Sequence, residues 1–311
     1  MKIDVFTHIL PEKYLAAFRK KAKPGTEFGE ASNRAMTDID MRLRLMDRYP
    51  DVLQVLTVSL PPLVEATIAP GDAVDLARTA NEELAELVDR YPDKFIGAVA
   101  CLPLTDMDSA LEETDRAITQ LGLKGVQIFT TINGETLDLP KFKPLYEKMA
   151  HYDLPIWIHP CSTKMHHEPL FGWPYETASA MRNLVLSGVF NDYPGIKFIT
   201  HHCGSMVPCF EGRIRWMVRL VLGAGHPIRE PVEHFRKFYN DTALYGGTSG
   251  LNCGYNFFGA DHLLFGTDAP LGPPYGLTAV TIDSIEKMDI PDEDKEKIFL
   301  RNVVELLRLA I

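Results

Sequence analysis

The sequence predicts an α/β fold in which eight parallel strands alternate with helices and close into a (β/α)8 TIM barrel. Short apolar runs rich in β-branched residues recur along the chain, and stretches with the period of amphipathic helices lie between them. There are eight such runs, the number that closes a barrel of this type. No linker rich in Ser, Gly or Pro divides the chain, so we expect one domain over residues 1–311.

The expected elements follow in strict alternation. Strands are expected at residues 3–6, 52–58, 95–100, 125–129, 156–159, 197–201, 238–241 and 263–266. Helical patterns occupy residues 38–48, 71–90, 107–121, 140–151, 175–190, 205–222 and 247–258, and two closing helices follow at 277–288 and 291–309. The last helix opens with Pro291 and an acidic first turn, which the helix dipole favours.

Residues 9–36, between the first strand and the first barrel helix, are interpreted as an inserted loop. They contain a helical stretch at 11–21 and then the turn-forming segment KPGTEFG at 23–29. Barrel active sites lie at the carboxyl ends of the strands, so this loop is expected over the catalytic face as a lid or substrate wall. A variable surface loop is the alternative.

Composition excludes several classes of partner. Hydrophobic residues make up 46% of the chain and charged residues 24%, and the net charge is −10. This charge argues against nucleic-acid binding, which needs clustered Lys and Arg. No apolar run approaches the ~20 residues that cross a bilayer, so no membrane association is expected. No leader-like segment opens the chain, so we expect no secretion.

Cysteine usage predicts a reduced, cytoplasmic protein. The five cysteines are odd in number, scattered and without a CxxC pair. They are Cys101, Cys161, Cys203, Cys209 and Cys253. A disulfide framework would show an even set at close spacing, so we expect free thiols.

The first strand ends on Phe6-Thr7-His8, which looks like a metal-binding His-x-His motif whose first histidine is replaced. Residues two apart on a strand point the same way, so Phe6 and His8 should face one place. Only His8 can bind a metal there. Phe6 is expected to form an aromatic wall of a substrate site.

Three further polar residues come directly after apolar strands, at the end where a barrel builds its site. They are His159, His201 and Asp268. Any one alone would more often be structural, but together with His8 they are expected to converge. Imidazole and carboxylate are the usual ligands of a catalytic zinc or similar divalent ion, which keeps an open position for water.

Short segments along nearly the whole chain carry a family resemblance. They are MKIDVFTHILP at 1–11, DIDMRLRLMD at 38–47, LKGVQI at 123–128, LPIWIHP at 154–160, GWPYET at 172–177, LSGVF at 186–190, HHCG at 201–204, GRI at 212–214 and FGTD at 265–268. In this order and spacing the chain resembles the amidohydrolase-related family (amidohydrolase 2), which includes aminocarboxymuconate-semialdehyde decarboxylase and γ-resorcylate decarboxylase.

The resemblance implies a barrel with one divalent metal, zinc first and manganese as the alternative. Its ligands would correspond to the position of Phe6 and to His8, His159 and Asp268, with His201 as acid or base. Phenylalanine cannot ligate, so three interpretations stay open. The metal sits on the remaining three ligands, it recruits His202 or Cys203, or it is absent. Residues 129–131 offer no Lys or Glu that could bridge two metals, which disfavours a binuclear hydrolase.

Substrate-binding candidates lie in three segments. Trp173 and Tyr175 are near the site by family position and could stack on an aromatic ring, with packing as an equal alternative. Arg34 is the candidate carboxylate-binding arginine, through a bidentate grip. His166 and His167 could touch substrate, although a solvated loop is the simpler interpretation.

The expected function is that of an enzyme: non-oxidative decarboxylation of a small aromatic or unsaturated carboxylic acid, with catalytic roles for His201 and Asp268. A hydrolase, hydratase or lactonase acting on a similar acid, metal-free because of Phe6, is the alternative. A non-catalytic barrel that binds a small molecule is the second alternative. Relatives are often dimers or tetramers, so we expect a homo-oligomer, which the segment 223–231 could help to form.

Overall fold

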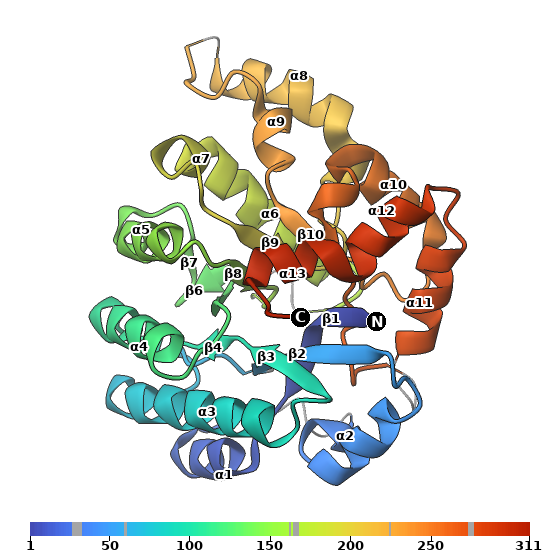
Figure 1. Cartoon of the computed structure of the whole chain (residues 1–311). Helices are drawn as coiled ribbons and strands as arrows, with labels where there is room; N and C mark the ends of the chain where they lie inside the picture. The colour runs from blue at the N-terminus through green and yellow to red at the C-terminus, as the bar shows by residue number, and fades with distance from the viewer. Residues whose placement is uncertain (27–32, 59–60, 162, 164–167, 224, 273–276) are drawn as a thin grey trace.

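The computed structural model describes residues 1–26, 33–58, 61–161, 163, 168–223, 225–272 and 277–311 (Figure 1). Its central strands form two parallel sheets. The first joins β1 (Lys2–Ile9), β2 (Val52–Val58) and β3 (Phe95–Ala98). The second joins, in spatial order, β11 (Leu263–Leu264), β10 (Tyr239–Asp241), β9 (Phe198–Thr200), β8 (Ile156–His159), β5 (Val126–Phe129) and β4 (Ala100–Cys101). A separate hairpin pairs β6 (Thr131–Ile132) with β7 (Glu135–Thr136).

The two sheets are continuous around a closed ring. At one junction β3 passes into β4 through Val99, whose N–H donates to Leu56 O at 2.9 Å. At the other, Val5 N donates to Phe265 O at 2.9 Å, and Thr7 forms a parallel bridge with Ala269. With β3 and β4 as one staggered position, the ring has the eight positions expected from the apolar runs. The predicted (β/α)8 barrel is confirmed.

The helices surround this ring, as Figure 1 shows. They are α1 (Glu12–Lys21), α2 (Ile39–Met46), α3 (Pro70–Arg90), α4 (Met107–Thr119), α5 (Lys143–Tyr152), α6 (Gly172–Leu186), α7 (Val189–Asp192), α8 (Glu211–Leu222), α9 (Pro231–Phe235), α10 (Thr248–Phe258), α11 (Thr278–Glu286), α12 (Asp292–Glu296) and α13 (Asn302–Leu307). Short 3-10 turns are η2 (Arg34–Met36), η3 (Pro140–Phe142), η4 (Pro208–Phe210) and η5 (Ala260–His262), and η6 (Lys297–Arg301) is a π-helical turn between α12 and α13. The pattern expected at 175–190 divides into α6 and α7 at Gly188, whose φ is 81°.

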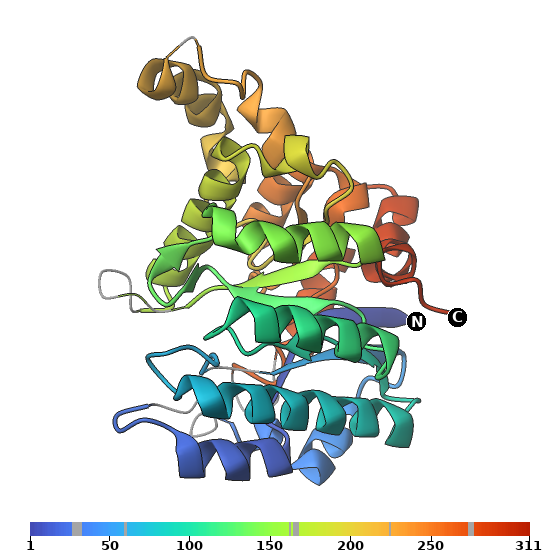
Figure 2. The same cartoon turned by 90° about the vertical axis from the view of Figure 1, so that its left-hand side faces the viewer.

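One end of the barrel is filled by apolar side chains. Val5, Trp157 and Ile199 are fully buried in a cluster that also contains Val303 and Leu307 of α13. The Trp157 indole N–H donates to Val5 O at 3.2 Å, which satisfies its only polar atom. Figure 2 places both chain ends on this side, where the strands begin. A functional site is therefore confined to the opposite end, where the strands finish.

The segment at residues 9–36 contains α1 and η2, and its ends are joined by Leu10 N donating to Met36 O at 2.8 Å. The first turn of α1 is held on α3, because the N–H groups of Lys13 and Tyr14 donate to the Glu83 carboxylate, each at 2.9 Å. Residues 27–32 lie outside the described part, so the role of this segment over the catalytic face stays a prediction, as does the single domain over 1–311. None of the helices within the described ranges is long and apolar enough to cross a membrane.

Candidate active site

Four polar side chains meet at the carboxyl end of the barrel. His8 lies near the end of β1 and His159 ends β8, while His201 and Asp268 follow β9 and β11. All four are at most 3% exposed. His8 Nε2 lies 3.0 Å from Asp268 Oδ1 and 3.4 Å from His159 Nε2, and the His159 and His201 rings are 5.5 Å apart. The predicted convergence of strand-end residues is therefore present in the fold.

Hydrogen bonds define which ring nitrogens of His8 and His159 carry the proton. The Thr57 hydroxyl donates to Thr7 O at 2.9 Å, so its oxygen must accept from His8 Nδ1, which lies 3.0 Å away. His159 Nδ1 lies 2.6 Å from Pro160 O, which can only accept. In the neutral rings both Nε2 atoms therefore present lone pairs, and these lone pairs face each other.

His201 is oriented in the same way by a carboxylate. Its Nδ1 donates to Asp241 Oδ2 at 2.6 Å, and both side chains are fully buried. The Nε2 atom has no hydrogen-bond partner among the described residues. Burial raises the pKa of Asp241 to about 6, so this carboxyl is largely ionised at neutral pH. The pair leaves His201 with one free basic nitrogen inside the site.

The electrostatics of the cluster keep two of its imidazoles neutral. Burial lowers the pKa of His159 well below its usual value, and His8 and His201 lower it further. Burial also lowers the pKa of His201 well below its usual value, and His202 and His8 add to the effect. At neutral pH both rings are therefore bases, suited to ligate a cation or to take up a proton during a reaction.

Asp268 stays ionised despite its burial. Burial raises its pKa, but the contact with His8, the charges of His8 and His202, and the hydroxyl of Tyr245 that donates to Oδ2 together hold the pKa below its usual value. Its backbone has a φ of 63°, in the left-handed region, and its N–H donates to Phe6 O at 2.9 Å. The other oxygen, Oδ1, has no well-directed hydrogen bond from any described residue.

Phe6 occupies the centre of the histidine cluster. Its ring is stacked on His201 at a centroid distance of 3.6 Å and an interplanar angle of 16°. It meets the His8 ring edge-on at 4.7 Å and the His159 ring at 5.7 Å. Phe6 and His8 thus face one place, as the strand spacing predicts, and Phe6 walls the site with an apolar surface.

The donor set fits a divalent ion in its chemistry and in two of its separations. Edges of about 3.3 Å between ligand atoms are expected for a tetrahedral ion with bonds of about 2.0–2.1 Å, and the His8–His159 and His8–Asp268 separations are of this order. When the two imidazoles are neutral, the Nε2 lone pairs of His8 and His159 and the Asp268 carboxylate lie together, an arrangement that a cation stabilises. Among the described residues, however, no three His, Cys, Asp or Glu side chains already stand in metal-binding arrangement.

The two residues considered as replacement ligands are placed differently. On a strand, His202 should point away from the site, but β9 ends at Thr200 and the left-handed backbone of His202 (φ 58°) brings its ring to 5.9 Å from Phe6. Cys203 is buried against Gly254 of α10, where even one added carbon would collide with its sulfur. Its thiol thus lies against α10, and burial raises its pKa.

The substrate-binding candidates lie at different distances from the cluster. Trp173 is near it, with its ring 6.2 Å from that of His159. Tyr175 is 42% exposed and lines an apolar groove together with residues of α8, such as Ile214 and Met217. His166 and His167 lie outside the described residues.

Arg34 begins η2 as an exposed side chain 3.5 Å from Asp38. The preceding residue, Asn33, donates to Pro270 O, two residues after Asp268, so this segment adjoins the strand-end loop that carries the carboxylate. Its role in binding substrate stays a prediction.

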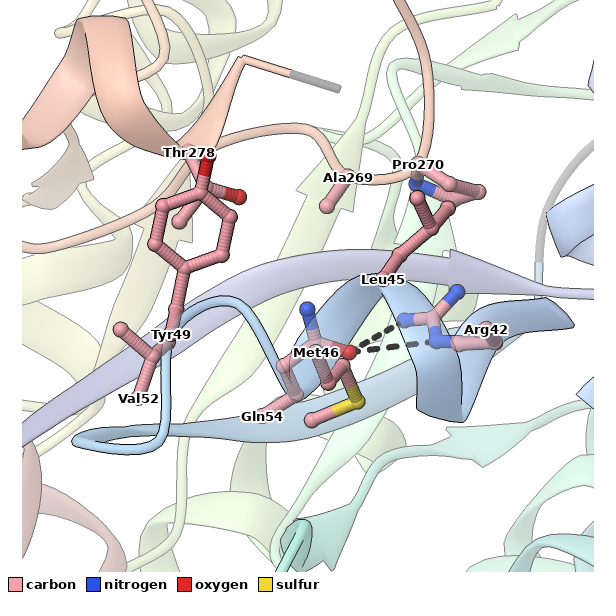
Figure 3. Close-up of a pocket in the computed structure, with 9 residues that line it drawn as sticks. All are labelled: Arg42, Leu45, Met46, Tyr49, Val52, Gln54, Ala269, Pro270 and Thr278. Carbon is pink, nitrogen blue, oxygen red and sulfur yellow. Dashed lines mark hydrogen bonds between the residues drawn. The ribbon is translucent and has the colours of Figure 1, made fainter. Parts of the chain in front are cut away.

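The buried side chain of Arg42 donates a hydrogen bond to the backbone of β1. Arg42 donates through Nε and Nη2 to Gln54 Oε1, at 3.1 and 2.7 Å (Figure 3). Its Nη1 donates to the carbonyl of His8. Its hydrogen bonds are thus made to the barrel wall. The hydrogen bond from Nη1 fixes the backbone of His8 and so helps to position its imidazole ring.

Sequence reasoning missed three partners of the site residues: Thr57, Asp241 and Tyr245. Asp241 ends β10, so the rule that selected the other strand ends would have found it. Thr57 lies within β2 and gives no such signal. Tyr245 lies in a turn after β10 and reaches Asp268 only through its left-handed backbone (φ 53°), which no periodicity reveals.

This fold and site define a barrel enzyme class with imidazoles and a carboxylate at the strand ends. A family model described as "Amidohydrolase" matches residues 3–309, and the chain belongs to this family. A 2-amino-3-carboxymuconate-6-semialdehyde decarboxylase from Dictyostelium discoideum is 29% identical, over 99% of this chain and 92% of the relative. A γ-resorcylate decarboxylase from Rhodococcus jostii is 30% identical, over 92% of each chain.

A solved structure gives the same result for the fold. The crystal structure of a dihydroxybenzoic acid decarboxylase from Polaromonas sp., with bound manganese and the inhibitor 2-nitroresorcinol, superposes with a TM-score of 0.83 at 25% identity. The match covers 99% of this chain and 96% of that one.

Proposed function

We propose that this protein is a metal-dependent, non-oxidative decarboxylase of small aromatic or unsaturated carboxylic acids. The observation that carries the proposal is the buried meeting of His8, His159 and Asp268 beside the free Nε2 of His201. Similarity to decarboxylases of γ-resorcylate and aminocarboxymuconate semialdehyde supports this reaction. Hydroxybenzoic acids are therefore the first substrates to test.

His8, His159 and Asp268 are the proposed metal ligands. A divalent ion held there would supply positive charge that stabilises negative charge on the oxygen atoms of the substrate. Zinc suits two imidazoles and a carboxylate, whereas the Polaromonas relative binds manganese. Measuring the metal content decides between them.

His201 and Asp268 are the proposed proton carriers. Decarboxylation breaks the bond to the carboxyl carbon, CO2 leaves, and the electron pair left on the substrate carbon takes up a proton. His201 is neutral and has its Nδ1 bonded to Asp241, so Nε2 can accept a proton from a substrate hydroxyl or water and deliver it to that carbon. Asp268, which accepts a hydrogen bond from the hydroxyl of Tyr245, is proposed to take part in the same proton transfer.

Aromatic and cationic side chains are proposed to orient the substrate. Phe6 presents an apolar ring at the centre of the site, and Trp173 adds a second aromatic surface beside His159. Arg34 would bind a carboxylate from the segment that adjoins Pro270. Tyr175 is proposed to contact the substrate at the outer edge of the site.

One observation favours a second candidate function. Phe6 removes a ligand position and stacks on His201, which leaves that imidazole and Asp268 able to act on water without a metal. A metal-free hydrolase, hydratase or lactonase for a similar acid would use these two groups as base and acid. A barrel that only binds a small acid is the non-enzymatic alternative.

Metal removal separates these functions. Protein purified without chelator is assayed for metal content and for CO2 release from hydroxybenzoic acids, then assayed again after chelation and after return of zinc or manganese. We expect bound metal and turnover that is lost and restored with it. Full activity in metal-free protein would favour the hydrolytic candidate, and inert, metal-free protein would leave the binding barrel.

The ligand assignment gives a matched pair of variants. Asp268→Asn should lose metal together with a factor of at least about a hundred in kcat/KM, because one carboxylate serves both roles. Asp261→Asn is the control, since Asp261 is exposed and pairs only at the surface with Lys297. Unchanged metal occupancy in Asp268→Asn would contradict the assignment.

A further inference from the structure

Two cysteines far apart in the sequence lie side by side in the fold. Cys209 belongs to η4 and Cys253 to α10, and their sulfur atoms are 3.6 Å apart. Cys209 is exposed and Cys253 is partly exposed, and both are free thiols. The sulfurs of a disulfide are about 2.05 Å apart, so this pair has to close by roughly a further 1.5 Å to form one.

The segment that carries Cys209 leads directly out of the catalytic cluster. It starts at His201, runs through the left-handed residues His202 and Cys203, and ends in η4 at the root of α8. Within this segment Cys203 packs against Gly254 of α10, and Gly254 follows Cys253 directly in the sequence. Figure 1 shows α10 near the start of α8. A second link at Cys209 would fasten the outer end of the same segment to the same helix.

We propose that Cys209 and Cys253 form a reversible disulfide when the protein meets a hydroperoxide, and that this bond ties the His201–Cys209 segment to α10. The inference is independent of the proposed decarboxylase activity, because it rests on the thiol pair alone.

The chemistry balances with one molecule of hydrogen peroxide, the simplest hydroperoxide, and two thiols. The Cys209 thiolate attacks one peroxide oxygen, so an S–O bond forms, the O–O bond breaks, and the leaving oxygen departs as water after protonation. Cys253 then attacks the Cys209 sulfenic acid, the S–S bond forms, and the hydroxyl leaves as a second water. Sulfur is oxidised and the peroxide is reduced. A dithiol reductant reverses the change by thiol–disulfide exchange.

Exposure assigns the order of the two thiols. Cys209 is the more exposed and meets the oxidant first. Burial and the adjacent Cys209 together raise the pKa of Cys253 to about 11, so Cys253 is poorly suited to the first attack and acts as the resolving thiol. Cys203 is enclosed behind them and stays out of the reaction.

The test uses the full-length protein. It is treated with a modest excess of hydrogen peroxide, its remaining thiols are alkylated, and its peptides are mapped by mass spectrometry with and without a dithiol reductant. We expect the loss of two of its five thiols, a peptide pair joined through Cys209 and Cys253 within one chain, and full reversal by the reductant. Hydrogen exchange across residues 202–210 should slow in the oxidised form.

Three serine variants supply the controls. Cys209→Ser and Cys253→Ser should each abolish the joined peptide and the slower exchange, whereas Cys101→Ser, distant in the fold, should keep both. The proposal is overturned by a link through Cys203, by a link between two chains, by oxidation of Cys209 that never resolves, or by unchanged exchange in the linked protein.

Discussion

Phe6 stands where a His-x-His motif would supply another imidazole to the site. Its ring is buried and stacks on His201, so the position is aimed at the cluster even though the side chain cannot ligate. Restoring histidine there should complete the donor set of His8, His159 and Asp268. We therefore expect this residue to limit how strongly the proposed site holds a metal.

The variant Phe6→His should raise affinity for zinc on the order of tenfold or more, because it adds one ligand to a site that is short of them. Competition against a chromogenic chelator measures the affinity. Phe6→Leu is the matched control, since it removes the stacked ring without adding a donor, and its affinity should not rise. Equal affinities in wild type and Phe6→His would show that the ring at this position does not face the metal.

Asp4 makes the stability of the fold depend on pH. It is fully buried and accepts hydrogen bonds from the N–H and hydroxyl of Thr267, yet burial raises its pKa to about 7. The folded protein thus binds this proton more tightly than the unfolded chain does. The resulting stability is fully present below about pH 4 and is lost as the pH rises towards 7.

Asp4→Asn keeps the shape of the side chain and removes its titration. Between pH 5 and pH 8 the wild type should lose about 2.5 kcal/mol more unfolding free energy than Asp4→Asn loses. Urea unfolding at several pH values measures the difference, with the exposed Asp47→Asn as control. Parallel curves for wild type and Asp4→Asn would show that burial of Asp4 does not penalise its charge.

At the scale of elements, the strand at Val126–Phe129 depends on the glycine before it. Gly125 has a φ of 146°, and a Cβ there would collide with the carbonyl oxygen of Pro155 and with the Trp157 ring. This backbone therefore approaches β8 more closely than any side chain permits. The close approach lies where β5 and β8 begin, opposite the site, and it fixes the register that pairs Phe129 with His159 at the site end.

Gly125→Ala should destabilise the protein by about 2 kcal/mol or more, because both the backbone conformation and the contact with Pro155 are lost. Gly212→Ala in α8 is the contrasting variant, since nothing lies within 4 Å of its added carbon. There the gain in helix propensity should stabilise by up to about 1 kcal/mol. Thermal unfolding compares the two, and similar melting temperatures would contradict the steric argument.

The elements themselves were largely predictable, and their ends were not. All eight expected strand segments contain strands, because β-branched apolar runs of this length have few alternatives. The strand expected at 263–266 is regular over Leu263–Leu264, and the one expected at 197–201 is regular over Phe198–Thr200. Strand ends depend on where neighbouring backbones diverge, which is a property of the assembled barrel.

At the scale of the whole molecule, α8 stands apart from the barrel. Figures 1 and 2 show this helix at the top of the view, away from the central strands, and none of its residues is buried. Trp216, Leu220 and Val221 are strongly exposed, an apolar face that a second copy of the chain would cover. The homo-oligomer expected from the family resemblance stays a prediction, and this helix is where we expect its interface.

Sedimentation analysis of wild type and of Leu220→Glu tests that expectation. The oligomer of Leu220→Glu should dissociate to monomers, because its interface would have to bury an unpaired carboxylate. Val280→Glu, which alters an exposed apolar residue of α11, serves as control and should leave the oligomer intact. A monomeric wild type would contradict the oligomer itself. An oligomer unaffected by Leu220→Glu would place its interface on another surface.

The sequence by itself determined the barrel, the end of it that carries the site, and the four residues His8, His159, His201 and Asp268. These follow from local periodicity and from the rule that parallel strands finish at one edge. Only the tertiary structure decided their partners, the direction of Cys203, and the meeting of Cys209 with Cys253. Those contacts depend on left-handed turns and helix packing between segments far apart in the chain, which no local pattern encodes.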